Sequence, residues 1–181
     1  MDVNLGIGNV SGYFYHAPAN TELPASPLAT LASGWEEVGY ISEEGITWST
    51  GRSSEPLKDW AKQIRRLLQS ESTGTVKAPI ISTTAEVLKT IFGASNVSAS
   101  AASTTHGALV SVAVGEGAVS DAEAFLFIMK DGDDALMLGT TSGYITALDD
   151  ISFKPGDPIT WNATISADTW TFMKDDGNTT T

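Results

Sequence analysis

Two histidines are the side chains of this sequence best suited to acid–base chemistry near neutral pH, and they stand at His16 and His106. They lie far apart along the chain, and neither has a Gly-x-Ser-x-Gly or similar nucleophile context. The chain has no cysteine, which removes disulfides, thiolate metal ligands and thiol nucleophiles together. We therefore expect both histidines to be structural, and we expect no catalytic residue, no cofactor and no metal site.

Carboxylates are the other groups that could do chemistry, because several occur in adjacent pairs. Neighbours on a strand point to opposite faces, so such a pair cannot share a proton. The segment from Lys130 to Asp134 has the carboxylate density of a calcium loop, but it lacks the spacing and the bidentate Glu of an EF-hand. We interpret this segment as a tight Asp-Gly hairpin. The pairs, which we expect in turns and on solvated surface, are Glu36–Glu37, Glu43–Glu44, Asp149–Asp150 and Asp175–Asp176.

The charge balance of the chain excludes one class of protein. Twenty-two acidic residues stand against 10 basic ones, which gives a formal net charge of -12 over 181 residues. Proteins that bind nucleic acid need the opposite sign, because Lys and Arg displace the counterions around phosphates. Acidity nevertheless suits a DNA conduit, whose wall should repel phosphates so that the polymer slides through.

The length fits one domain, and the N-terminus carries no sign of a targeting segment. The first residues lack a basic region followed by an apolar one, and no run approaches the ~20 apolar residues of a membrane span. We expect synthesis in the cytosol and no association with a membrane.

Short alternating segments separated by turns predict a mainly β fold, an antiparallel β-sandwich or barrel. In the segment 158–165, Ile159, Trp161 and Ala163 should face the core, whereas 125–129 is apolar on both faces. Both sides of that strand should be covered, either by the core and a helix or by a neighbouring subunit. Two hairpins are expected: one joins 35–41 to 46–50 around the turn 42–45, and the other joins 62–70 to 75–82 around Thr73-Gly74. Further turns are expected at 115–117 and 154–157. The other expected strands are 10–17, 108–114, 122–130, 136–140, 144–153 and 158–165.

One short helix is signalled at about 84–92. Thr83-Thr84-Ala85-Glu86 offers a capping box, and Gly93 can take the left-handed conformation at the end. Its apolar residues fall on one face, so it should cover one side or end of the sheet. We expect the Pro-containing segment 18–34 and the Ala/Ser/Thr-rich segment 94–106 to be loops.

Basic residues are concentrated in one stretch of this acidic chain. Five of the 10 fall within residues 52–66. A basic patch is complementary to the acidic surface of another copy, so it could form a head-to-tail contact, or it could be a solvated hairpin. The sequence leaves these two interpretations open. The five residues are Arg52, Lys58, Lys62, Arg65 and Arg66.

The succession of several blocks resembles the major tail tube proteins of long, non-contractile bacteriophage tails. The blocks are Gly12-Tyr13 in an opening strand, a Pro-rich loop, Trp35-Glu36-Glu37-Val38-Gly39-Tyr40-Ile41-Ser42-Glu43-Glu44-Gly45-Ile46, Glu55-Pro56-Leu57-Lys58-Asp59-Trp60-Ala61, and Glu86-Val87-Leu88-Lys89-Thr90-Ile91-Phe92-Gly93. Their order covers most of the chain. Single blocks are weak signals, whereas the succession is fairly specific.

The resemblance implies a single tail tube domain over residues 1–170, an extended inter-ring loop at about 42–62, and a short polar tail at 171–181. It implies hexameric rings that stack into a tube in the virion, assembled in the host cytoplasm, with DNA passing through the lumen without specific binding. Expected partners are the chain itself, the tape measure, the terminator and the distal tail protein. The expected ring-to-ring residues are Glu43, Glu44, Arg52, Lys58, Trp60, Lys62, Arg65 and Arg66, and the candidate lumen-facing acids are Glu36, Glu123 and Asp149.

Two other classes of function stay open at this stage. A carbohydrate- or ligand-binding β-sandwich could use Trp35, Trp48, Trp60, Trp161 and Trp170 as stacking surfaces. Another virion part, a tail terminator or a head decoration protein, would also be an acidic, non-catalytic subunit.

Overall fold

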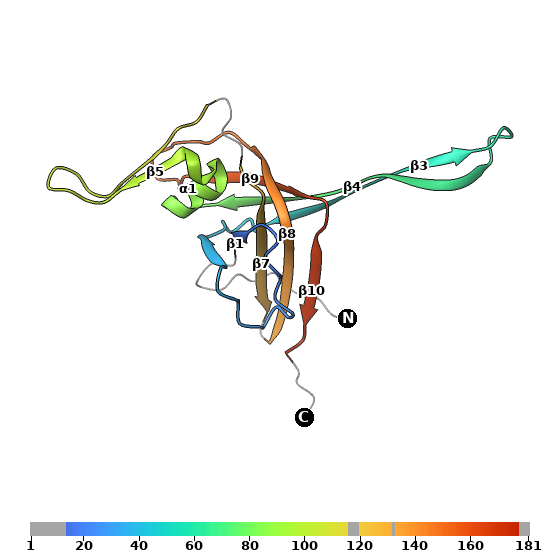
Figure 1. Cartoon of the computed structure of the whole chain (residues 1–181), viewed down its shortest axis with the longest axis horizontal. Helices are drawn as coiled ribbons and strands as arrows, with labels where there is room; N and C mark the ends of the chain where they lie inside the picture. Colours follow the sequence, from blue (N-terminus) through green and yellow to red (C-terminus); the bar gives the residue numbers. More distant parts are fainter. Residues whose placement is uncertain (1–13, 116–119, 132, 178–181) are drawn as a thin grey trace.

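The fold of the chain is mainly antiparallel β with one α-helix, as predicted (Figure 1). The computed structural model describes residues 14–115, 120–131 and 133–177, with residues 52–55, 65–72 and 131 described by their backbone alone. Its elements are β1 (Phe14–Pro18), β2 (Glu36–Gly39), β3 (Thr47–Lys58), β4 (Ile64–Ile80), α1 (Ala85–Phe92), the 3₁₀ turn η1 (Ala94–Asn96), β5 (Val97–Ser100), β6 (Leu109–Val112), β7 (Glu123–Asp131), β8 (Asp134–Leu148), β9 (Trp161–Ala167) and β10 (Thr171–Asp175).

Strand β8 belongs to both layers of the sheet. Its first half pairs with β7 and β10, and its second half, from Tyr144, pairs with β9. Between the halves, the Thr140 hydroxyl donates to the carbonyl of Ser142 and accepts from its N–H, and the register against β7 shifts. A strand that bends in this way carries a sheet around a corner. The resulting strand order is β2-β1-β7-β8-β9-β4-β3, and β5 pairs with β6 in a small separate sheet.

The main core lies between the two layers and is closed by α1. Phe14 of β1 stacks on Phe127 and Phe125 of β7, with ring centroids 4.6 and 6.0 Å apart. Val76 of β4 and Ile165 of β9 enter the same cluster from the second layer. The predicted alternation of the last long strand is confirmed, because Trp161, Ala163, Ile165 and Ala167 of β9 are all buried.

A second, smaller cluster covers the other face of β7. Leu126, Ile128 and Met137 are buried there, and the loop between β1 and β2 packs on them through Leu23, Leu31 and Trp35. Met173 of β10 joins them, and the Ser26 hydroxyl donates to the Asp175 carboxylate, which lowers the pKa of that carboxyl. The strand predicted to be apolar on both faces is therefore covered by this chain itself.

Helix α1 begins and ends as the sequence indicates, although its cap differs in detail. The N-cap is Thr84, whose hydroxyl accepts from the N–H of Val87, and Gly93 follows the last turn with φ 84°. Thr83 does not start a capping box, because its hydroxyl accepts from the Trp161 indole N–H at 3.1 Å. Glu86 pairs instead with Lys89 one turn later at 2.8 Å.

Several strand pairings expected from sequence are wrong. Strand β2 pairs with β1, and β3 pairs with β4, so the turn at residues 42–45 does not join a hairpin. Thr73-Gly74 is no turn, because it lies inside the continuous strand β4. The strands predicted at 136–140 and 144–153 are one continuous strand, β8, which ends at Leu148, so residues 149–153 lie outside it.

Other segments hold more regular structure than expected. The segment 42–62, expected as an extended loop, is largely β3. The segment 94–106 contains η1 and β5, and residues 171–175 of the expected polar tail form β10. The predicted turns at 42–45 and 154–157 are present. Residues 10–13 of the first predicted strand and most of the turn predicted at 115–117 lie outside the described residues.

The stacked phenylalanines make a direct test of the core. Phe125 is fully buried, so Phe125→Ala should lower the free energy of unfolding by about 3–5 kcal/mol. Phe153 is 72% exposed, and Phe153→Ala should change it by less than about 0.5 kcal/mol. Urea unfolding followed by circular dichroism measures both. Equal effects of the two substitutions would contradict this packing.

Candidate assembly surface

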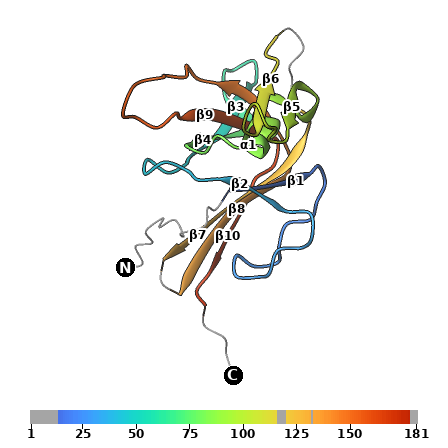
Figure 2. The same cartoon turned by 90° about the vertical axis from the view of Figure 1, so that its left-hand side faces the viewer.

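Strands β3 and β4 extend beyond the body as a two-stranded arm, defined here as residues 51–73 (Figure 1); in Figure 2 this arm points away from the viewer, behind the body. Strand β4 pairs with β9 only from Gly74 onward, so within the described parts of the chain the ribbon from Gly51↔Thr73 to Lys58↔Ile64 consists of these two strands alone. Eight residues of extended chain span roughly 25 Å. Register shifts at Ser53/Ser54 and Leu57/Lys58 add local twist to this ribbon.

Large apolar side chains are exposed at the tip of the arm. Trp60 is fully exposed, and Leu57 and Ile64 are more than half exposed. The turn that presents them is ordered: the Asp59 carboxylate accepts from the Gln63 N–H at 2.9 Å, and the Lys62 N–H donates to the Asp59 carbonyl. A defined turn that exposes three apolar side chains has the character of an interaction site.

The basic cluster also lies on the arm, but the acidic turn predicted to meet it does not. Lys58 and Lys62 are exposed at the tip, and the backbones of Arg52, Arg65 and Arg66 belong to its two strands. Glu43 and Glu44 are exposed in the turn before β3, at the opposite end of that strand. The structure therefore separates Glu43 and Glu44 from the basic residues, of which Lys58 and Lys62 lie at the tip of the arm and Arg52 lies near its base.

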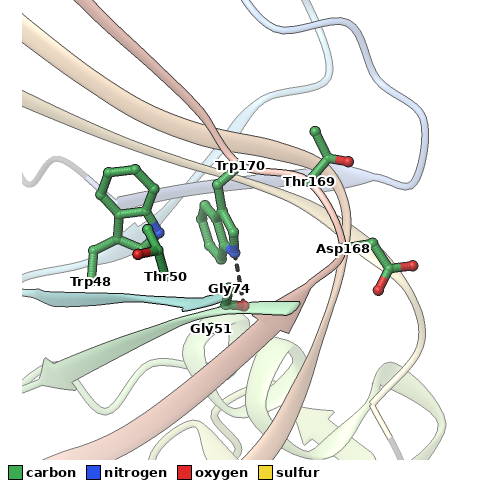
Figure 3. A pocket seen from close by; sticks show the side chains of 7 residues that line it. All are labelled: Trp48, Thr50, Gly51, Gly74, Asp168, Thr169 and Trp170. Atoms are coloured by element: carbon green, nitrogen blue, oxygen red, sulfur yellow. Dashed lines mark hydrogen bonds between the residues drawn. The ribbon is translucent and has the colours of Figure 1, made fainter. Parts of the chain in front are cut away.

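The arm leaves the body beside two tryptophans. The Trp170 indole N–H donates to the Gly74 carbonyl at 2.9 Å, and Trp170 and Trp48 line a pocket of about 210 Å³ (Figure 3). Gly74 lies so close to this ring that a Cβ atom would stand 2.5 Å from the Trp170 Cδ1. Trp48 also stacks on Phe172, with centroids 6.3 Å apart. This junction fixes where β3 and β4 leave the sandwich.

The three acids suggested for a lumen occupy two different places. Glu36 and Glu123 flank His16, whose Nδ1 lies 3.0 Å from the Glu123 Oε2 and whose Nε2 lies 3.9 Å from the Glu36 Oε2. Asp149 is exposed after β8 and lines a pocket of about 290 Å³ with Glu44 and Lys77. Glu36 is exposed, whereas Glu123 is largely enclosed by its contact with the histidine.

The comparison with protein families identifies the class of the chain. A family model described as phage tail tube protein matches residues 7–179. The chain belongs to this family. Tail tube proteins are structural, so membership places the chain in the virion tail, where it assembles with copies of itself and with other tail proteins. No individual curated protein matches the sequence.

A tail tube protein is expected to use its tryptophans for packing and assembly, and their placement agrees with this role better than with sugar binding. Trp161 is buried, and Trp35 and Trp170 pack against the two clusters. Trp48 and Trp60 are exposed, but they lie at opposite ends of β3. The pocket beside Trp48 is smaller than the roughly 300–1,000 Å³ typical of small-molecule sites. No helix among the described residues is long and apolar enough to cross a membrane.

Sequence patterns did not single out Leu57 or Ile64 as parts of the surface. Both are aliphatic residues of strands, and their type alone assigns them to a core. The only available signal was their position on either side of Trp60 within the basic cluster. Their exposure becomes evident once the pairing of β3 with β4 is known.

The junction of arm and body can be tested at Gly74. In Gly74→Ala the new methyl group would collide with the Trp170 ring, so the free energy of unfolding should fall by about 1–3 kcal/mol. Urea unfolding followed by tryptophan fluorescence measures the change. Gly107→Ala is the control, because its Cβ would meet no atom within 4 Å, and it should change stability by less than about 0.5 kcal/mol. A Gly74→Ala variant as stable as this control would show that the contact does not hold the junction.

Proposed function

We propose that six copies of this chain close into a ring, that rings stack into the tail tube, and that DNA passes from capsid to host through the lumen. The family match supports the tube, and the arm supports a contact that reaches beyond one subunit. In addition, no strand of the described residues pairs with the outer edges of β2 and β3. Open edges of this kind can pair with another copy.

The arm is the part of the molecule that we assign to the contact between rings. An isolated two-stranded ribbon is marginally stable in water, so a partner surface is needed to hold it in place. Its tip offers Leu57, Trp60 and Ile64, which would be removed from water by that partner. The exposed tip of the arm is the single observation that carries this proposal.

The charges at the two ends of β3 indicate which surfaces meet in the contact between rings. The arm carries Lys58 and Lys62 at its tip, whereas Glu43 and Glu44 lie at the opposite end of β3. Within one chain these groups are too far apart to pair, but the tip of one copy can meet the acidic turn of a copy in the next ring. Opposite charges at the two ends of one element favour head-to-tail association, which repeats without limit along an axis.

The acidic surface suits the passage of DNA. With a net charge of -12 per chain, a wall built from these subunits repels phosphates. We propose Glu36, Glu123 and Asp149 as lumen-facing acids, and we expect Asp149 to contribute most, because it is exposed and lies apart from His16. Specific binding of DNA is not part of the proposed function.

The other proposed partners are the proteins that begin, measure and end the tail. The tape measure would occupy the lumen during assembly in the host cytoplasm, and the distal tail and terminator proteins would contact the two end rings. An end ring leaves either its arms or its acidic turns without a partner ring, so each of these two proteins would meet a different surface.

Trp60 provides the sharpest test of the arm. Purified wild-type protein at high concentration should show stacked rings by negative-stain electron microscopy. Trp60→Ala should abolish stacking, because the tip loses its largest apolar side chain, while the free energy of unfolding changes by less than about 0.5 kcal/mol. Trp60→Phe is the matched control and should still stack. Normal tubes from Trp60→Ala would show that the tip of the arm is not needed for stacking.

Charge reversal tests the direction of the contact. The variant Lys58→Glu/Lys62→Glu should fail to form tubes, because its tip would face Glu43 and Glu44 with the same sign. Adding Glu43→Lys and Glu44→Lys in the same chain should restore stacking, which sedimentation and electron microscopy can measure. If the fourfold variant stays unassembled while Glu43→Lys/Glu44→Lys alone assembles normally, the proposed pairing is wrong.

A further inference from the structure

Four ionisable side chains meet at one edge of the sandwich. His16 on β1 and Glu36 on β2 are direct neighbours in the strand register, and α1 packs against β2 and brings Glu86 to the same place. One potential ligand atom from each of these three residues lies within 4.8 Å of the others. Glu123 on β7 contacts the same histidine from the other side. Residues from three elements thus converge on an imidazole carried by a fourth.

The contact with Glu123 determines which nitrogen of His16 is available. The Nδ1 atom lies 3.0 Å from the Glu123 Oε2, and a carboxylate can only accept, so Nδ1 carries the proton. In the neutral ring the lone pair is then on Nε2. This atom is buried and has no hydrogen-bond partner among the described residues, since the Glu36 Oε2 is 3.9 Å away. A carboxylate that orients a histidine in this way is the usual support of a metal-binding imidazole.

The charges of the cluster leave room for a divalent cation. Glu36, Glu86 and Glu123 contribute three negative charges, and Lys89 offsets one of them through its 2.8 Å bond to the Glu86 Oε1. That bond raises the pKa of the Lys89 ammonium and occupies only one oxygen of Glu86. With neutral His16, two negative charges are unbalanced within this group.

The site is also open to an ion from solvent. Glu36 and Glu86 have side chains that are 64% and 43% exposed, so both can rotate toward the histidine. A pocket of about 430 Å³ adjoins the cluster and is lined by His16, Glu36, Asp121 and Glu123. An ion entering from this side could keep water as a further ligand.

We propose that His16, Glu36 and Glu86 bind one divalent transition-metal ion, for which Zn²⁺ is the best-suited candidate, and that Glu123 is a positioning residue. One imidazole and two carboxylates with a water complete a four-coordinate zinc site. Bonds of about 2.0–2.1 Å place neighbouring ligand atoms about 3.3 Å apart. The observed 3.9 Å between the His16 Nε2 and the Glu36 Oε2 requires only a small movement of an exposed glutamate. The ion would tie α1 to β1 and β2.

The test is calorimetric titration of the full chain with ZnCl₂, together with thermal unfolding with and without the ion. We expect saturable binding of one Zn²⁺ per chain and a rise of several degrees in Tm, because an ion that binds only the folded state stabilises it. Glu86→Gln should weaken binding more than tenfold, and it is suited to the test because Glu86 lies on the helix surface. Glu37→Gln is the matched control: it removes the same charge next to Glu36, from the opposite face of β2, and should bind normally.

Separate measurements test the roles of His16 and of Glu123, the residue that positions it. His16→Gln should abolish saturable binding, whereas His106→Gln, at an exposed loop position, should not. Glu123→Gln should weaken Zn²⁺ binding about 10–100-fold. The ¹⁵N chemical shifts of His16 should report a protonated Nδ1 in the wild type and a change at Nε2 when Zn²⁺ is added. Absence of saturable binding, or equal affinity in Glu86→Gln and Glu37→Gln, would show that His16 is instead a structural histidine between two carboxylates.

Discussion

The bend in β8 is the constraint on which the rest of this fold depends. Because one strand pairs with β7 and β10 before the bend and with β9 after it, a single continuous strand joins the two layers. The bend turns β9 and β4 over the stacked rings of Phe14, Phe125 and Phe127, which closes the main core under α1. The same strand carries β10, which helps to cover the second cluster. Sheet topology and the main core both depend on this one strand.

The body and the arm differ in how their side chains are packed. In the body, side chains on both faces of β7 are buried, so stability comes from packing within one chain. In the arm, the side chains of Leu57, Trp60 and Ile64 face solvent, and the backbones of β3 and β4 pair with each other. The body is therefore packed within one chain, whereas the apolar tip of the arm is left exposed to solvent.

Sequence patterns predicted the elements that depend on neighbouring residues, but they did not predict the pairing of strands that lie far apart in the sequence. Helix α1 was predictable from Gly93 and its apolar face, and β9 from its alternation, because each depends on nearby residues. The pair Thr73-Gly74 predicts a turn, but in the structure Gly74 lies within β4. The Trp170 ring occupies the space that a side chain at position 74 would need, and Trp170 comes 96 residues later in the sequence. Glu36 and Glu123 are candidate lumen-facing acids by sequence, and nothing in the sequence indicates that the fold brings both to His16, which lies 107 residues before Glu123. The basic cluster was visible from composition, but its separation from Glu43 and Glu44 depends on which strand pairs with β3.

The shape of the arm also governs how the molecule responds to force. A ribbon of two strands has no second layer to resist bending, so it is far more compliant than the sandwich from which it extends. Deformation will concentrate between the fixed junction at Trp170 and the ordered turn at Asp59, both of which are held by hydrogen bonds. In the proposed tube, subunits joined through such ribbons would behave as rigid bodies connected by flexible links. Such a tube would curve by bending the arms while each sandwich keeps its shape and its charge.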